Sequence, residues 1–155
     1  MKCERIVHHE VAAPTDVAGD NRSKESCPIK LGVDIHRESY VAVAQHGQEH
    51  PKPPRKFLPT EFVPWVERLI AAGHEVAVVY ESCGFGFDLQ RQLQSLGAAC
   101  YVISPQKLDE NMSRVKTDGR DARTLCVRLS RYLAGNRHEL AVIRIPSEEE
   151  DRRRH

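Results

Sequence analysis

The amino-acid sequence predicts an α/β domain whose mixed sheet begins with an antiparallel hairpin, continues in βαβα units and carries helices on both faces. Residues 31–36 and 40–46 are two short β-rich runs separated by only three residues, which is typical of a hairpin. Residues 75–81 and 98–104 are continuous apolar runs of the kind found in buried parallel strands. Segments with helical periodicity alternate with these runs, which favours βα units over an all-β fold.

The first half of the chain extends the hairpin and then turns helical. A proline-rich loop over 46–54 leads to residues 55–58, which we expect to form a third strand at the sheet edge. The next helix is predicted over 60–72, with Thr60 as its N-cap and Gly73 as its stop. Its apolar residues recur at helical spacing: Phe62, Val66, Leu69 and Ile70.

The second half alternates strands and helices. A helix over 87–96 joins the two apolar strands, and residues 106–117 are expected to link the second of them to a last helix over 119–133. That helix has one apolar stripe, formed by Ala122, Leu125, Cys126, Leu129, Tyr132 and Leu133. Residues 140–145 follow as a short strand or an extended exit. This order of elements is that of the ribonuclease H-like fold.

Composition fits one globular domain. The chain has 155 residues, 40% of them hydrophobic, and a formal net charge of +1. We expect a flexible polar extension over 1–29, the folded domain over 30–146 and a charged tail over 147–155. Five cysteines, an odd number, favour a reducing, cytoplasmic location, and no apolar run approaches the length of a membrane span.

Four acids carry most of the functional information. Asp34 lies within the first apolar run and Glu81 ends another, whereas Asp118 and Asp121 open the last helix on its core-facing stripe. A carboxylate among strand residues is costly to bury unless a partner stabilises it. Mg²⁺ or Mn²⁺ prefers such oxygen ligands, and sites in open α/β sheets form at the carboxyl ends of strands. We therefore expect one metal site built from these four acids.

The expected chemistry is phosphodiester displacement, with two metal ions about 3.5–4 Å apart holding the attacking and leaving oxygens. Each acid alone also has a plainer explanation. Asp118 is a candidate N-cap with Asp121 at the third helical position, Asp34 a candidate partner for an arginine, and Glu81 a strand end.

Basic residues gather near the acid pair. Residues 105–137 hold eight Lys and Arg against four acids. A positively charged stripe suits a polyphosphate partner, although a helix face exposed to solvent has the same pattern. The candidates for contact with a nucleic-acid backbone are Lys116, Arg120, Arg123 and Arg128.

Four stretches resemble the N-terminal domain of the DEDD transposases, the insertion-sequence family 110 group with its related DNA invertases: 32–36 (GVDIH), 80–84 (YESCG), 103–105 (ISP) and 115–122 (VKTDGRDA). The resemblance spans about residues 30–148. It implies a RuvC-like fold and maps the family's four acids onto Asp34, Glu81, Asp118 and Asp121.

The same resemblance implies DNA and a structured bridge RNA as partners, Mg²⁺ as cofactor, and homo-oligomeric assembly in the full-length protein. Such recombinases also use a serine nucleophile in a separate C-terminal domain. This chain ends soon after residues 145–147 (IPS), so we expect it to lack that domain, with Ser147 in the connector and not the nucleophile. Strand transfer by this chain alone is therefore not expected.

Two alternatives stay open at this point. The second hypothesis is a non-catalytic module that binds RNA or DNA or that dimerises, in which case the basic residues matter more than the acids. A stand-alone RuvC-like junction resolvase would need only the acids and a dimer.

Overall fold

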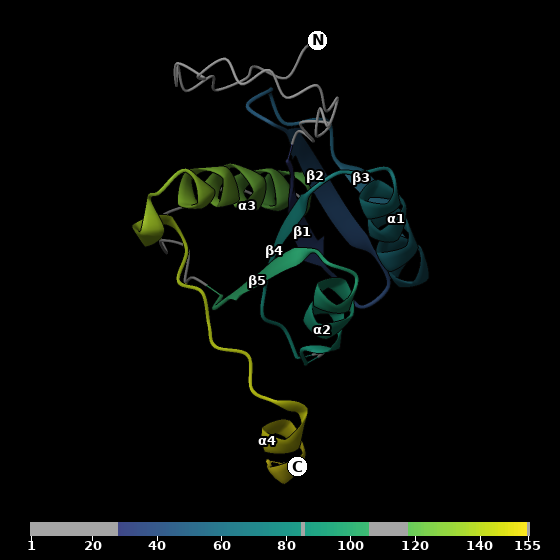
Figure 1. The fold of residues 1–155 in the computed structure, drawn as a ribbon, viewed down its shortest axis with the longest axis vertical. Helices are drawn as coiled ribbons and strands as arrows, with labels where there is room; N and C mark the ends of the chain where they lie inside the picture. The colour runs from purple at the N-terminus through teal and green to yellow at the C-terminus, as the bar shows by residue number, and fades with distance from the viewer. Residues whose placement is uncertain (1–27, 85, 106–117, 155) are drawn as a thin grey trace, which may run out of the picture.

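The computed structural model describes residues 28–84, 86–105 and 118–154. Five strands form one sheet in the order β3-β2-β1-β4-β5 (Figure 1). The strands are β1 (Ile29–Ile35), β2 (Tyr40–His46), β3 (Arg55–Phe57), β4 (Val76–Glu81) and β5 (Ala99–Ile103). The expected extension and the linker over 106–117 lie outside the described residues, apart from the start of β1, which begins one residue before the expected domain boundary.

Strand pairing confirms the predicted fold class. β2 pairs antiparallel with both β1 and β3, whereas β4 is parallel to both β1 and β5. A tight hairpin is enough to join antiparallel strands, but parallel strands need a longer crossover. The chain reaches β4 from β3 through one helix and β5 from β4 through another. The sheet is therefore the mixed sheet, with an antiparallel hairpin followed by parallel strands, that the element order predicts.

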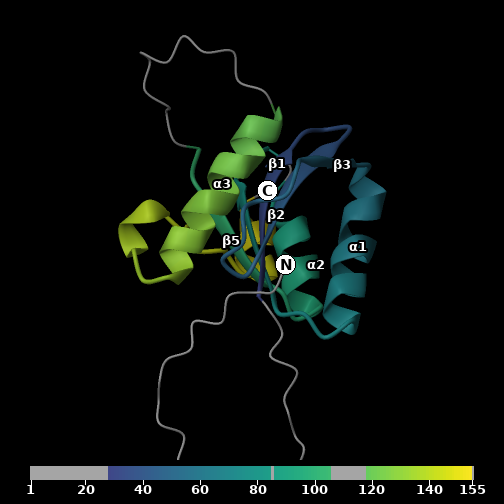
Figure 2. The same ribbon diagram turned by 90° about the horizontal axis from the view of Figure 1, so that it is seen from above.

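Helices cover both faces of the sheet (Figure 2). α1 (Pro59–Ala71) and α2 (Asp88–Ser95) pack on one face, where the core includes Phe62, Val66 and Leu93. α3 (Asp118–Leu133) packs on the other, across β1 and β2. Its buried residues include Ala122, Leu125, Cys126 and Leu129, which confirms the apolar stripe seen in the sequence.

The predicted cap of α1 is wrong. The helix begins at Pro59 with Leu58 as N-cap, so Thr60 lies inside the first turn. The Leu58 amide donates instead to the Glu61 carboxylate at 3.1 Å. Proline needs no amide partner at the first helical position, and an acid two residues later replaces the hydroxyl cap that Thr60 would have offered.

The end of the chain crosses from one face of the sheet to the other. After the short 3₁₀ helix η1 (Arg137–Glu139), Leu140 is buried on the α3 face, Val142 bridges to Ile103 of β5, and Ile145 packs on the α1 and α2 face. This confirms an extended exit over 140–145. It also covers the open edge of β5, a position that would otherwise invite pairing with another strand.

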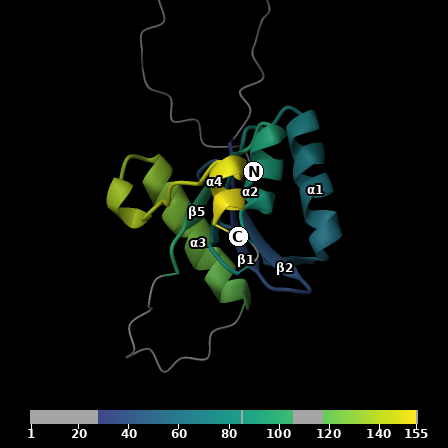
Figure 3. The same ribbon diagram turned by 90° about the horizontal axis from the view of Figure 1, so that it is seen from below.

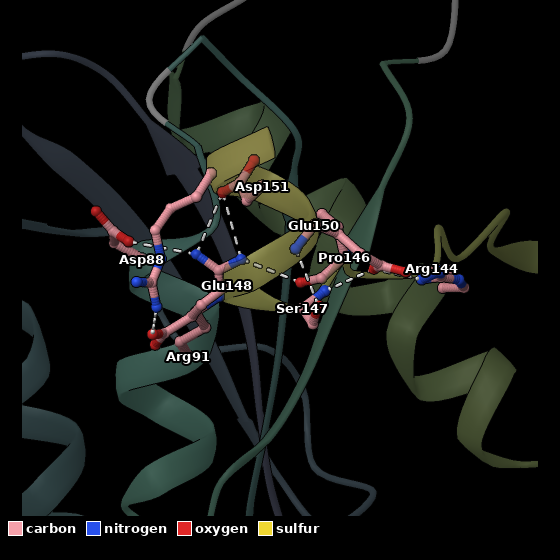
Figure 4. Close-up of polar contacts among 9 residues, drawn as sticks. Asp88, Arg91, Arg144, Pro146, Ser147, Glu148, Glu150 and Asp151 are labelled. Atoms are coloured by element: carbon pink, nitrogen blue, oxygen red, sulfur yellow. Dashed lines mark hydrogen bonds and ion pairs between the residues drawn. The ribbon is translucent and has the colours of Figure 1, made fainter. Parts of the chain in front are cut away.

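A last helix, α4 (Glu148–Arg153), follows where the sequence predicts only a charged tail. Ser147 and Glu150 form a capping box at its start. α4 lies beside α2 (Figure 3). Arg91 of α2 donates to the Pro146 carbonyl at 3.0 Å and pairs with Asp151 at 3.3 Å (Figure 4). None of the helices over the described ranges is long and apolar enough to cross a membrane.

Candidate metal and nucleic-acid site

Asp34 and Glu81 occupy matching positions on neighbouring parallel strands. The register of β1 and β4 pairs Gly32 with Val79 and Val33 with Tyr80, so the next residue on each strand is an acid. Val79 packs on the α3 face of the sheet. Because side chains alternate along a strand, the acids two residues beyond Gly32 and Val79 belong to that same face. Both therefore lie at the carboxyl edge of the sheet, on the side that α3 covers.

The direction of α3 brings its first residues toward this edge. Ala122 and Cys126 lie against Gly32, whereas Ser130 contacts Lys30, four residues earlier on β1 than Asp34. Later residues of the helix thus meet earlier residues of the strand, and the two run antiparallel. The N-terminus of α3, which starts with Asp118 and has Asp121 in its first turn, consequently points toward the edge that carries Asp34.

A glycine makes this packing possible. A Cβ on Gly32 would overlap the carbonyl oxygen of Ala122 and the amide nitrogen of Cys126. Both are backbone atoms, so no side-chain rotation relieves the overlap. The backbones of β1 and α3 are therefore in direct contact at Gly32, and this contact fixes the height of the helix above the sheet.

A buried lysine holds the other half of α3. Lys30 is 4% exposed, and its Nζ donates to the Gly47 carbonyl at 3.0 Å and to Ser130 Oγ at 3.1 Å. Desolvation lowers the pKa of this ammonium. The Cys126 thiol donates to the Lys30 carbonyl at 3.4 Å, and burial raises the pKa of that thiol to about 11. Both groups are structural anchors and not reactive ones.

Asp34 has a histidine partner that the sequence reading missed. His36 Nε2 lies 3.0 Å from Asp34 Oδ2, with the two side chains 45% and 20% exposed. An ionised carboxylate only accepts, so Nε2 carries the hydrogen. The sequence analysis had considered an arginine as the alternative partner. The spacing of two residues at a strand end was the available signal, because it places both side chains on one face.

The structure brings the predicted acids to one end of the domain without closing a site around them. Among the residues it describes, no three His, Cys, Asp or Glu side chains lie close enough together to hold a metal ion. The side chain of Asp118 is outside that description, and Asp121 is half-buried. Hard carboxylate oxygens at adjacent strand ends, facing a helix N-terminus, are still a donor set that suits Mg²⁺ or Mn²⁺.

The predicted basic residues have different surroundings. Arg123 is exposed on α3. Arg128 is half-buried and its Nε donates to the Glu139 carbonyl at 3.0 Å, so this side chain also holds η1 against α3. Lys116 and the side chain of Arg120 lie outside the described residues.

One exposed lysine lies on the same face of the sheet as Asp34, as the strand register shows. Asp34 pairs with Val41 on β2, and Val41 pairs with Lys56 on β3. Directly paired residues point to the same face, so Lys56 shares the face of Asp34, two strands away, at about 10 Å. Lys56 is exposed at the sheet edge. Its neighbour Arg55 belongs to the opposite face, where its guanidinium lies 4.8 Å from the centre of the Phe57 ring.

Comparison with known proteins found transposases at modest identity. The chain is 29% identical over 98 residues to the transposase for insertion sequence element IS1533 of Leptospira borgpetersenii, covering 61% of this chain and 28% of that protein. It is 28% identical over 113 residues to "Putative transposase y4pF/y4sB" of Sinorhizobium fredii, covering 72% and 28%. A third, "Putative transposase y4rJ" of the same organism, is 37% identical over 81 residues, covering 50% and 20%.

The match spans less than a third of the length of these relatives. No protein-family model matches the chain. Among solved structures, T. thermophilus RuvC in complex with Holliday junction substrate aligns with a TM-score of 0.41 at 12% identity, over 74% of this chain and 99% of that one.

Proposed function

We propose that this chain is a DNA-processing domain of a transposase that acts on phosphodiesters with the help of Mg²⁺ or Mn²⁺. One observation carries the proposal: two acids at the ends of adjacent parallel strands face the side on which α3 begins with two more. The similarity to transposases over 61% and 72% of the chain supports it independently.

In this proposal Asp34, Glu81, Asp118 and Asp121 hold the metal. The bound cation would polarise a phosphodiester oxygen and lower the pKa of a bound water. The protein's own part is to fix the carboxylates. The strands set two of them in register, and the N-terminus of α3 stabilises the negative charge of the other two.

Nucleic acid would reach the acids along the surface that carries Arg123 and Lys56, with Lys116, Arg120 and Arg128 as further candidates. Arg123 and Lys56 are exposed, and Lys56 shares a sheet face with Asp34. Cations at such positions contact phosphates and set the register of the backbone without reading its sequence. The bridge RNA, homo-oligomeric assembly and cytoplasmic location stay predictions that follow from the sequence and its resemblance.

Calorimetric titration of Mn²⁺ tests the acid site. We compare the wild-type chain with Asp34→Asn, Glu81→Gln, Asp118→Asn and Asp121→Asn, each of which removes charge and keeps shape. Each variant is expected to weaken Mn²⁺ binding more than about tenfold. Loss of a residue that only hydrogen-bonds to a metal ligand already costs about tenfold or more, and loss of a ligand should cost at least as much. The melting temperature should change little, because these positions serve binding and not packing.

Asp88→Asn is the matched control. Asp88 opens α2 on the opposite face, and its side chain is 86% exposed. It should bind Mn²⁺ like the wild type. If the four site variants and Asp88→Asn bind Mn²⁺ equally, the cation is held by surface charge at large and the proposed site is wrong.

A further inference from the structure

Two tyrosines and an arginine are stacked at the end of α3, on the α3 face of the sheet. Tyr101 of β5 and Tyr132 of α3 meet edge to face, with their ring centres 5.5 Å apart. The guanidinium carbon of Arg137 lies over the Tyr132 ring, 4.6 Å from its centre. The tyrosines are half-buried against the core of this face, whereas Arg137 is exposed. The stack therefore runs from the core to the surface, and the guanidinium is its outermost layer.

A Schellman turn at the end of α3 sets Arg137 over the ring. The Asn136 amide donates to the Arg131 carbonyl at 3.1 Å, and the Gly135 amide donates to the Tyr132 carbonyl at 3.1 Å. Gly135 has a φ of 116°, which residues with a side chain rarely adopt. The chain reverses there and η1 follows directly at that end of α3 (Figure 2). The backbone thus returns Arg137 to the last turn of the helix.

The surface around the stack is positively charged. Residues 128–139 carry three arginines and one acid, Glu139. The Glu139 carboxylate pairs with Arg131 at 3.7 Å. Within the described ranges, no acid pairs with Arg137. The charge of this surface therefore favours a polyanion as its partner.

We propose that Arg137, supported by Tyr132, is a stacking platform for an unpaired base of single-stranded DNA. A guanidinium is planar and stacks on aromatic faces, so one that covers the tyrosine on one side offers its other side to a second ring. In a duplex, neighbouring base pairs cover both faces of each base, whereas an unpaired base has a face to offer. The inference rests on the proposed function and deepens it, because it names the form of DNA that the domain holds.

The stack shares a face of the sheet with the acids. Tyr101 pairs with Val79 on β4, and Glu81 lies two residues further along that strand. With strands about 4.8 Å apart and a rise of about 3.3 Å per residue, the Cα atoms of Tyr101 and Glu81 are about 8 Å apart. A single strand held at the stack would therefore lie close to the acid edge.

Fluorescence anisotropy on the full chain tests the platform with two labelled probes. One is a short oligothymidylate. The other is an abasic oligomer of the same length, which keeps the phosphates and lacks the bases. EDTA removes metal from both titrations. The wild type is expected to bind the oligothymidylate at least about fivefold more tightly than the abasic oligomer, which is the low end of the effect of one stacked base.

Arg137→Lys keeps the charge and removes the plane. It should lose the preference for oligothymidylate. Its affinity for the abasic oligomer and its slope of log affinity against log salt should stay at the wild-type values, because both depend on phosphate contacts. Arg131→Lys is the matched control, since the Arg131 guanidinium pairs with the Glu139 carboxylate and not with a ring. This control should keep the preference.

Each other outcome overturns the platform. No preference in the wild type would show that the chain stacks no base. Full preference in Arg137→Lys would place the stacked base elsewhere, and equal losses for both probes would make Arg137 a phosphate contact. Loss of the preference in Arg131→Lys as well would make it a property of the charged surface. These results leave the acid site standing, because they are measured without metal, and a failed Mn²⁺ titration would leave the platform standing.

Discussion

The two faces of β1 are built from different kinds of residue. Toward α1 and α2 the strand presents Ile29, Leu31 and Val33, all fully buried in one apolar core. Toward α3 it presents a lysine, a glycine and an aspartate in the alternate positions, Lys30, Gly32 and Asp34. One face is built to exclude water, and the other is built to hold a helix at a set height beside an acid.

The difference extends to the residues that meet each face. Aromatic rings gather on the α1 and α2 side, where the centre of the Phe62 ring lies 5.7 Å from the ring centres of both Tyr40 and Phe57 in edge-to-face geometry. On the α3 side, small residues, Ala122 and Cys126, allow backbones to touch. Large rings supply free energy of burial, whereas small residues supply close positioning. Mutations on the two faces should therefore have different consequences.

Phe62→Ala should give the largest loss of stability. Phe62 is fully buried, and removing such a ring costs about 3–5 kcal/mol in transfer and cavity terms. Urea unfolding measures this loss. Because the ring lies on the face away from the acids, Mn²⁺ affinity below the unfolding transition should match the wild type.

Phe62→Leu is the milder companion, since it keeps part of the ring's volume and should cost less. If Phe62→Leu weakened Mn²⁺ binding while remaining folded, the two faces would be coupled. The division between a stabilising face and a positioning face would then fail.

Gly32→Ala should have the opposite effect to Phe62→Ala: a modest loss of stability and a large loss of Mn²⁺ affinity. The added methyl meets backbone atoms of α3, so the helix must move, at a cost of about 1–3 kcal/mol for overpacking. The same displacement moves the N-terminal acids of α3 away from Asp34. Mn²⁺ affinity should therefore fall by more than the stability loss accounts for, as measured on protein that circular dichroism shows to be folded.

Gly84→Ala is the matched control, because a Cβ there meets no atom within 4 Å. The same chemical change should leave both properties near wild type. Full Mn²⁺ affinity in a folded Gly32→Ala variant would mean that the height of α3 does not set the acid site.

The periodic parts of this fold could be predicted from the sequence, and the polar details could not. The apolar runs of β4 and β5 and the stripe of α3 each repeat one rule over five or more residues, so single exceptions do not hide them. The placement of Asp34 and Glu81 side by side followed from the same patterns. Their roles as ligands remain a prediction.

The features that escaped prediction depend on contacts between distant segments or on one local signal. Nothing near Lys30 shows that Ser130 will meet it, and nothing near Gly32 shows that a helix will lie against it. The cap of α1 was misassigned because Thr60 outranks Leu58 by residue type. α4 was readable, since Ser147 and Glu150 have the spacing of a capping box, but six residues give little periodicity.

The smallest expected effect is on DNA binding, and it distinguishes the two faces of the sheet at its β3 edge. Arg55 and Lys56 are consecutive and both exposed, yet alternation puts Lys56 on the face of Asp34 and Arg55 on the other, over Phe57. Lys56→Glu should weaken binding to duplex DNA several-fold without metal, because it replaces a phosphate partner by a repelling charge. The slope of log affinity against log salt should fall by about one.

Arg55→Glu makes the same change of charge one residue away, so it controls for net charge alone. Long-range attraction is screened beyond about 10 Å at 0.1 M salt, and the two variants should become distinguishable there by fluorescence anisotropy. A loss only in Lys56→Glu would place the DNA path on the face that carries the acids. Equal losses would mean that the whole sheet edge attracts DNA, whichever face a cation lies on. The difference between the two faces of β1 would then concern metal binding and not DNA binding.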